Sequence, residues 1–282
     1  MPYFENKALQ VTIKSQAIFL IGLLCLASLY TSWVDRIERK LYGVKPGVTI
    51  EEHQIGGFMP GEVEVVVDEL VIKYRQMPRD AHIDRDSGEI IHDINGTEVN
   101  VEATTRAIFA APSDTNIKVI TMEIPARHKS DQLKPITKEI GSFYTWSYGS
   151  WQRHENIVLA ARSINNQFIW PGGDFSFNKT VGPRTPERGY RPAPVIGGDG
   201  IGFGGGICQV STTLYNAALA AELEIVEKHQ HSTKVPYINA GKDATVVYGA
   251  QDLRLKNNFP YPVIIKSGVY RGKILVTIMG KQ

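Results

Sequence analysis

One cysteine stands in a setting that favours chemistry. The stretch GGDGIGFGGG, in which seven glycines fall within ten residues, precedes the uncharged run ICQVSTTLYNAALAA over 207–221, and Cys208 is the second residue of this run. This run predicts a helix that is buried on most sides. The N-terminus of a helix favours an anion and so lowers the pKa of a thiol placed there. The pattern therefore makes Cys208 the candidate nucleophile.

A cysteine nucleophile also needs a base and a group that orients the base. His229 and His231 follow the predicted helix, and Asp243 comes before an apolar segment. Cysteine at a helix start, then histidine, then an acid is the chain order of papain-like and transglutaminase-like enzymes, an analogy of order alone. The sequence leaves open which histidine takes part. It also leaves open a structural role for Cys208, because cysteine is among the most buried residue types.

Residues near the cysteine form a candidate substrate site. Glycines let a ligand approach the backbone closely, an amide next to the thiol can donate to an oxyanion, and arginine binds carboxylate or phosphate bidentately. The hydroxyls within the helix have the alternative of bonding to their own backbone, and the arginines that of solvated loop charges. The candidate substrate contacts are Gly204, Gly205, Gly206, Gln209, Ser211, Thr212, Tyr215, Arg184 and Arg188.

Several functional classes are disfavoured. No lysine follows the glycines and no GxGxxG is present, so a nucleotide site is not expected. A formal charge of +2 without a basic, aromatic-rich run argues against nucleic acid as a partner. With Cys25 and Cys208 as the only two cysteines, a disulfide between folded parts and a multi-cysteine zinc site are both excluded. We predict no metal and no cofactor.

An apolar stretch lies near the N-terminus. Ala17–Val34 contains eighteen residues without a charge, about the length that crosses a bilayer as a helix. An uncleaved anchor is favoured over a signal peptide, because Ala27-Ser28-Leu29 is a poor cleavage site. More Lys and Arg follow this stretch than precede it, so the charge rule alone places the C-terminal side in the cytoplasm.

The stretch over 47–135 predicts a small α+β module. Glu62–Met77 has apolar residues near helical spacing, with a strand as the alternative. His82–Asp93 predicts a hairpin, Val99–Ala111 a second helix, and Ile117–Ile124 a strand.

The remainder, 136–282, predicts a larger α+β domain in which the helix over 207–221 packs on a mainly antiparallel sheet. Asn156–Phe168 predicts another helix. Its predicted strands are Ala244–Tyr248, Leu253–Lys256, Val263–Lys266 and Lys273–Met279. The fold class is thus α+β, with a tail and transmembrane helix over 1–46, the small module and this domain. Five aromatic residues between Phe143 and Trp151 either pack on the domain or offer a sugar-stacking surface, and packing is the commoner use.

Long motifs in the C-terminal half closely resemble the VanW family. They are PGGDFSFNKTVGPRTPERGYRPAPVI, GGGICQVSTTLYNAAL, EIVEKHQHS and GKDATVVYGAQDLRLKNNFPYPVII, and they run in order from about Arg153 to about Lys266. The family takes its name from a gene that accompanies vancomycin-resistance clusters. The order of residues over 47–135, from Pro78-Arg79-Asp80-Ala81 to Pro125, loosely resembles a peptidoglycan-binding module; a generic spacer is the alternative.

The resemblance implies a setting and no reaction. Family members occur mainly in Gram-positive bacteria, and many carry an N-terminal membrane segment with the domain facing the wall. That implication outweighs the charge rule, so we expect the soluble part to face the outside. The expected partners are peptidoglycan or its peptides, and the membrane through the N-terminal helix. Two functions remain: a cysteine-dependent enzyme acting on amide bonds of wall peptides, or a non-catalytic wall-binding or scaffolding protein.

Overall fold

The chain forms two compact units. The computed structural model describes the backbone over 2–195 and 200–281, and side chains over 20–195 and 200–281. One unit comprises Met1–Pro78 and Asn95–Pro125, and the other comprises Arg79–Ile94 and Ala126–Gln282. This division places Arg79–Ile94 with the C-terminal part of the chain, whereas the sequence analysis assigned these residues to the 47–135 module. The domain boundaries drawn from the sequence stay a prediction.

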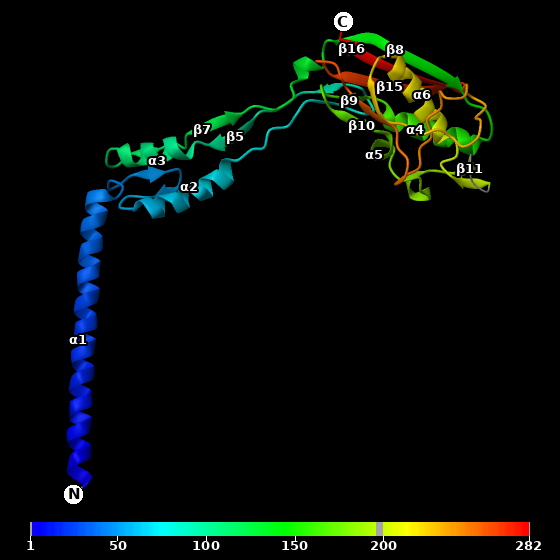
Figure 1. Ribbon diagram of the computed structural model, residues 1–282. Helices are drawn as coiled ribbons and strands as arrows, with labels where there is room; N and C mark the ends of the chain where they lie inside the picture. The colour runs from blue at the N-terminus through cyan, green and yellow to red at the C-terminus, as the bar shows by residue number, and fades with distance from the viewer. Residues whose placement is uncertain (1, 196–199, 282) are drawn as a thin grey trace. The chain divides into compact units, whose positions relative to one another are not determined.

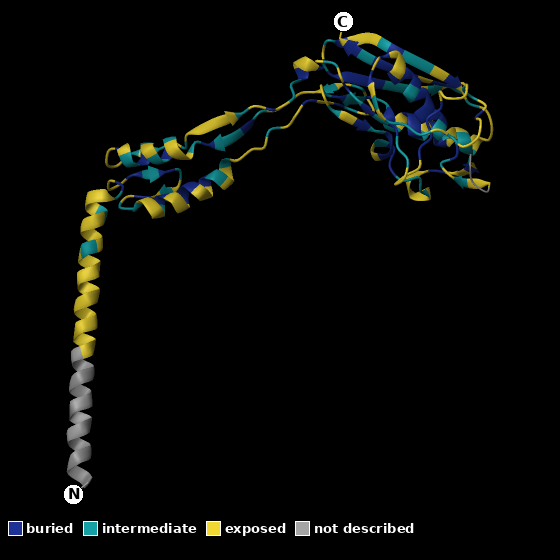
Figure 2. Cartoon of the chain, in the orientation of Figure 1, coloured by how far each residue is buried: buried dark blue, intermediate teal, exposed yellow. Residues whose placement is uncertain are grey.

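The first unit begins with a single long helix, α1 (Pro2–Tyr42). Within α1, Leu20–Tyr42 is long and apolar enough to cross a membrane by length and composition, a criterion that a signal sequence near the N-terminus also meets. The large apolar side chains along this part are exposed, and Figure 2 shows them in yellow. The apolar helix expected over Ala17–Val34 is therefore present from Leu20 on, and the side chains before Leu20 lie outside the described residues.

The rest of the first unit packs two helices and short strands around one apolar cluster (Figure 1). Its elements are β1 (Thr49–Ile50), β2 (His53–Gln54), α2 (Pro60–Tyr74), β5 (Gly96–Val99), α3 (Val101–Ala110), β6 (Asn116–Ile117) and β7 (Thr121–Ile124). α2 buries Val63, Val66, Val67 and Leu70, the spacing of one helix face. The helix expected over Glu62–Met77 is thus confirmed, and its strand alternative is wrong.

The second unit is built on a four-stranded antiparallel sheet of order β8-β16-β15-β9. Its strands are β8 (Ile136–Trp146), β9 (Gln167–Ile169), β15 (Val263–Tyr270) and β16 (Lys273–Lys281). Alternate residues of β16, Ile274, Val276 and Ile278, are fully buried, as expected for a sheet with one covered face. The prediction of an α+β fold with mainly antiparallel sheets is confirmed.

Two helices cover one face of this sheet. α4 (Trp151–Ile164) packs on β15, and α6 (Ile207–Ala220) packs on β8, β16 and α4. Figure 1 shows both helices against the sheet. Gly141 of β8 permits the close approach of α6, because a Cβ there would lie 2.4 Å from the backbone nitrogen of Ala221. The buried helix expected over 207–221 is therefore confirmed, and its C-terminal end lies close against β8.

Shorter elements complete the second unit. They are β3 (His82–Ile83), β4 (Ile90–Ile91), the 3-10 turn Ser130–Gln132, β10 (Asp174–Ser176), α5 (Phe177–Val181), the 3-10 turn Pro186–Arg188, β11 (Pro192–Pro194), β12 (Ile201–Phe203), β13 (Glu224–Glu227) and β14 (Arg254–Lys256). Strands β10, β14 and β13 form a second sheet, and β11 pairs with β12. The expected hairpin is the β3–β4 pair. It joins this unit because Ala81 and Ile83 are buried in a cluster with Leu133 and Ile264.

Three predicted elements differ from the structure. The helix expected over Asn156–Phe168 begins earlier, at Trp151, because the Ser150 hydroxyl caps it by accepting a hydrogen bond from the Arg153 N–H. It ends at Ile164, and the next residues form β9. The strand expected over Ala244–Tyr248 consists of two isolated bridges, because this segment is held by side chains of α6. The strand expected over Ile117–Ile124 is divided between β6 and β7.

Candidate active site

The start of α6 depends on three consecutive glycines. Gly204 and Gly206 have φ of +83° and +104°, a region that disfavours side chains. At Gly205 a Cβ would lie 2.5 Å from the carbonyl oxygen of Pro194. Gly206 is the N-cap, so Cys208 is the second residue of the helix. The glycines that precede the cysteine are therefore explained by backbone geometry and close packing at the helix start.

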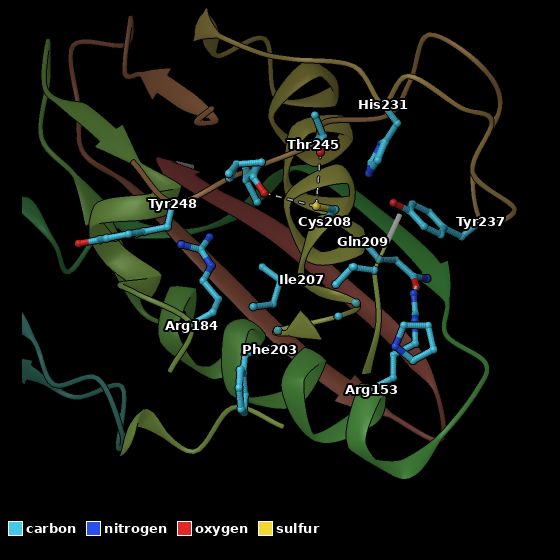
Figure 3. Close-up of a pocket in the computed structure, with 17 residues that line it drawn as sticks. Arg153, Arg184, Phe203, Ile207, Cys208, Gln209, His231, Tyr237, Thr245 and Tyr248 are labelled. Carbon is cyan, nitrogen blue, oxygen red and sulfur yellow. Dashed lines mark hydrogen bonds between the residues drawn. The ribbon is translucent and has the colours of Figure 1, made fainter. Parts of the chain in front are cut away.

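Cys208 lies in a pocket of about 420 Å³ (Figure 3). Its side chain is half-buried. The sulfur lies 3.5 Å from the Thr245 hydroxyl and 3.6 Å from the Val246 carbonyl oxygen. Its backbone N–H has no hydrogen-bond acceptor within the described part of the chain. An unpaired N–H beside a thiol is the arrangement that can bind an oxyanion.

His231 enters the same pocket and is oriented by Asp243. The Asp243 carboxylate Oδ2 accepts hydrogen bonds from the His231 backbone N–H at 2.7 Å and from Nδ1 at 2.8 Å. Both side chains are nearly buried, at 3% and 9% exposed. The other ring nitrogen, Nε2, is buried and makes no hydrogen bond of normal geometry to a described residue. This ring therefore has one edge held by an acid and the other available to the pocket.

The three groups shift one another's pKa. Burial raises the pKa of the Cys208 thiol. Interactions with His231, the Val246 backbone and Thr245 together lower this pKa by more than burial raises it, so the net pKa lies below its ordinary value. Burial lowers the pKa of His231, and the Cys208 and Asp243 partners raise it to a net value above the ordinary one. For Asp243, hydrogen bonds from His231 outweigh burial and lower the pKa. The arrangement thus favours a thiolate beside an imidazolium.

The second candidate histidine lies elsewhere. His229 Nε2 pairs with Glu227 Oε1 at 2.9 Å, and its side chain is 36% exposed. His229 is not among the residues that line the Cys208 pocket. Of the two histidines that the sequence left open, the structure brings His231 to the cysteine.

Hydroxyls of α6 hold the segment that carries the acid. Ser211 donates to the Ala244 carbonyl oxygen at 2.6 Å, and the Thr212 hydroxyl accepts from the Ala244 N–H at 3.0 Å. Both side chains are fully buried and outside the pocket lining. These bonds fix Ala244 between Asp243 and Thr245, so the two hydroxyls position the site. Their predicted role as substrate contacts is not supported by this placement.

Gln209 is fully engaged with its neighbours. Its Nε2 donates to the Thr145 hydroxyl at 3.1 Å and to the Trp146 carbonyl oxygen at 2.9 Å. Its Oε1 accepts from Arg153 Nη2 at 2.8 Å. Although Gln209 lines the pocket, both amide N–H groups are already used, so they are not available to an oxyanion.

The other predicted substrate contacts separate into two groups. Arg184 and the three glycines line the pocket. Arg188 is exposed and donates to the Val181 carbonyl oxygen, and Tyr215 lies under Lys228, 5.4 Å from its ammonium nitrogen. Neither Arg188 nor Tyr215 lines the pocket, because the Arg188 guanidinium is bonded to Val181 and Tyr215 packs against the core.

Arg153 and Tyr237 are among the pocket residues that sequence reasoning missed. Arg153 belongs to the first turn of α4, upstream of the predicted helix, and Tyr237 lies in a loop without a pattern. The Tyr237 hydroxyl is buried without a hydrogen bond of normal geometry to any described residue. Burial raises its pKa, so it stays a neutral donor. Both residues also line an adjoining pocket of about 260 Å³, together with Trp146 and Tyr148.

Among the described residues, no group of three or more His, Cys, Asp or Glu is arranged to hold a metal ion. The predicted absence of a metal and of a cofactor stays a prediction. The aromatic residues expected to pack are largely exposed: Tyr144, Trp146, Tyr148 and Trp151 are 46% to 78% exposed, while Phe143 packs against the core.

The second unit is thus an α+β domain that presents a cysteine and a histidine in one pocket, with an aspartate bonded to the histidine outside the pocket lining. Residues 152–279 match the model of the family described as VanW like protein. This part of the chain is a VanW-like domain, as the motifs indicated. The family match does not include residues 47–135, so their resemblance to a peptidoglycan-binding module stays a prediction.

Two curated proteins are similar to this chain. The uncharacterized protein YoaR of Bacillus subtilis (strain 168) is 40% identical over 176 residues, 61% of this chain and 58% of that protein. The vancomycin B-type resistance protein VanW of Enterococcus faecalis (strain ATCC 700802 / V583) is 32% identical over 110 residues, 36% of this chain and 40% of that protein. The matches therefore span about half the length of these relatives. No solved structure matches the chain.

Proposed function

We propose that this protein is a cysteine-dependent enzyme that acts on peptide amide bonds of the cell wall. The observation that carries the proposal is that Cys208 and His231 line one pocket, with Asp243 bonded to the far edge of the His231 ring. A vancomycin resistance protein among the relatives supports the cell wall as the setting. The apolar part of α1 would anchor the protein, with the domain on the outer side of the membrane.

The chemistry follows from the three side chains. The Cys208 thiolate attacks the amide carbonyl carbon, forming a C–S bond, and the developing oxyanion is met by the Cys208 N–H. His231 then donates its proton to the amine nitrogen as the C–N bond breaks, which leaves a thioester. A water molecule or a second amine attacks the thioester and gives a proton to His231, and the C–S bond breaks to release the thiolate, which restores the starting pair. Hydrolysis and transpeptidation differ only in this last nucleophile.

Asp243 has a positioning role in this scheme. Because its carboxylate accepts from both the backbone and Nδ1 of His231, it fixes the ring orientation and directs Nε2 towards the pocket. It also stabilises the imidazolium that the reaction requires. The second candidate function, a wall-binding scaffold, would use the same pocket without need of this pair.

The test compares the purified full-length chain in detergent with its Cys208→Ala variant on muropeptides. An enzyme gives new peptide products by mass spectrometry and loses them in the variant, while the unfolding temperature stays close to that of the parent. Hydrolysis products and new amides identify the second nucleophile. Wall binding that the variant retains, with no product from either protein, would favour the scaffold.

A further inference from the structure

Two arginines flank the thiol. Arg184 and Arg153 both line the Cys208 pocket, and Figure 3 shows Arg184 to the left and Arg153 to the right of Cys208. Arg184 lies towards Tyr248, and its guanidinium carbon is 5.6 Å from that ring centre. Arg153 lies towards Tyr237 and reaches the adjoining pocket. The attacked bond would therefore have one positive charge on each side.

Neutral groups hold both arginines. Arg184 donates to the Gly182 carbonyl oxygen at 2.8 Å and to Asn178 Oδ1 at 2.6 Å. Arg153 donates to the Ser147 hydroxyl at 2.9 Å and, as described, to Gln209. No ion pair joins either guanidinium to a carboxylate of the described residues. A guanidinium has five N–H donors, so each keeps donors for another partner.

Leaving these charges unpaired is unfavourable. Arg153 and Arg184 are part-buried. Burial lowers the pKa of both guanidiniums, whereas the charge of Cys208 acts on both in the opposite sense and that of Asp252 does so on Arg184. Neither pocket is lined by an Asp or a Glu among the described residues. A buried charge is normally balanced by a partner of opposite sign. The Cys208 thiolate is one negative charge in the pocket, but it pairs with His231. A carboxylate of the ligand is therefore expected at each guanidinium, because its planar shape fits the guanidinium fork.

We propose that Arg153 and Arg184 bind two carboxylates of one peptide substrate, one on each side of the amide that Cys208 attacks. This inference rests on the proposed function, because it names the substrate class of the same site. The preferred substrate is an acidic peptide with a carboxylate on the acyl side and another on the amine side. Amidation of either group weakens binding.

The first test uses two small alkylating reagents on the full-length chain in detergent. In both reagents the Cys208 thiolate attacks the methylene carbon, forms a C–S bond and displaces iodide, but iodoacetate carries a carboxylate and iodoacetamide does not. Their rate ratio therefore reports attraction of an anion and cancels changes in thiolate reactivity. We expect Arg153→Gln and Arg184→Gln each to lower the iodoacetate to iodoacetamide ratio about threefold or more.

Arg162→Gln is the matched control. It removes the same charge from α4, but Arg162 is exposed, pairs with Asp86 and lies outside the pocket lining. The ratio should stay unchanged in this variant. Arg153→Lys keeps the charge and should retain much of the ratio even if Arg153→Gln disturbs the fold. Equal ratios in the parent and both pocket variants would overturn the inference.

A second test measures binding without the thiol. A glutamyl-alanine dipeptide that is acetylated at its N-terminus has the glutamate side-chain carboxylate on the acyl side of its peptide bond and the alanine C-terminal carboxylate on the amine side. In the diamide of this peptide both carboxylates are replaced by neutral amides. Calorimetry on the full-length Cys208→Ala variant should show the diamide binding at least about tenfold more weakly. Equal affinity for the two peptides, or tighter binding of inorganic phosphate, would overturn the inference alone. Preference for the diacid without amide cleavage by the parent would overturn the catalytic proposal alone.

Discussion

At the scale of single residues, opposed effects set the state of the Cys208 thiol. Burial alone would keep it protonated, whereas His231 and the first turn of α6 favour the thiolate. The lowered pKa therefore depends on the imidazole. Removal of the imidazole takes away the largest cause that lowers the pKa and leaves burial as the largest single cause, so the pKa of Cys208 should rise.

We expect His231→Gln to move the pH midpoint of Cys208 alkylation upward. In the parent, thiolate is lost as pH falls through a pKa below the free-cysteine value of about 8.5, so reaction persists under that pH. In the variant the midpoint should lie above that of the parent. The measurement is the iodoacetamide rate between about pH 5 and 10 on the folded full-length chain.

The neighbouring histidine gives the control for this prediction. His229→Gln removes an imidazole two residues away that pairs with Glu227 outside the pocket, so the midpoint should not move. Equal midpoints for the parent and His231→Gln would mean that His231 does not ionise the thiol. A thiol that reacts only after unfolding would assign Cys208 a structural role.

Tyr237 offers a test of catalysis against stability. A buried hydroxyl without a partner costs about 1–3 kcal/mol, so Tyr237→Phe should leave the unfolding temperature equal or higher. If the hydroxyl donates to bound substrate, turnover of muropeptides should fall about tenfold or more. Tyr190→Phe is the matched control, because its hydroxyl is also buried and unpartnered but lies outside the pocket. A fall in turnover for both variants would contradict a direct role of Tyr237.

Part of the site could be predicted from single residues. Cys208 and Asp243 carried signals of type and position, and Arg184 stood in a loop rich in charge. The choice of His231 depends on where β13 ends and how Asp243 returns to α6, which no local pattern records. Arg153 and Tyr237 become pocket residues only through the packing of α4 and of a loop against α6.

At the scale of elements, the glycine-rich turn determines where Cys208 lies. We expect Gly205→Ala to destabilise the fold by about 1–3 kcal/mol, because its Cβ would meet backbone atoms that cannot move away. Displacement of the helix start should also slow alkylation of Cys208. Thermal unfolding and the iodoacetamide rate measure the two effects.

Gly268→Ala is the control for this change. Gly268 lies in β15, has no positive φ, and a Cβ there meets nothing within 4 Å. Its unfolding temperature and thiol reactivity should match those of the parent. If Gly205→Ala were equally neutral, close packing would not explain the glycines, and a direct role in ligand binding would become the better explanation.

Periodic elements were the predictable part of the fold. The apolar run of α6 and the helical spacing in α2 identified both helices, since the apolar residues that a helix buries recur in the sequence at helical spacing. The segment Ala244–Tyr248 reads as a strand by composition. Its backbone instead bonds to Ser211 and Thr212, so tertiary contacts override the local β pattern.

At the scale of the whole molecule, the apolar part of α1 is either a membrane anchor or a signal sequence. Its exposed leucines, from Leu20 to Leu29, are unfavourable in water and suit a bilayer. An anchor keeps residues 1–42 in the mature protein, whereas a signal sequence is removed. Intact mass of the protein from the membrane fraction distinguishes the two.

We expect the full-length chain to stay with membranes after an alkaline carbonate wash. Leu24→Arg combined with Leu26→Arg should release much of it, because each arginine at mid-span costs about 2.5–3.5 kcal/mol on insertion scales. Ile72→Arg is the control, since Ile72 is equally apolar and 79% exposed but belongs to α2. Release of the parent by the wash would contradict an anchor.

Labelling of Cys208 can show on which side of the membrane the C-terminal domain lies, because one of the two cysteines of the chain lies in the apolar helix and the other is Cys208. A membrane-impermeant maleimide added to intact cells should label Cys208 if the domain faces the wall, and Cys208→Ser should abolish the label. Labelling that appears only after lysis would place the domain in the cytoplasm, as the excess of basic residues after the span suggests. Wall peptides would then be out of reach, and the substrate would have to be a cytoplasmic acidic peptide.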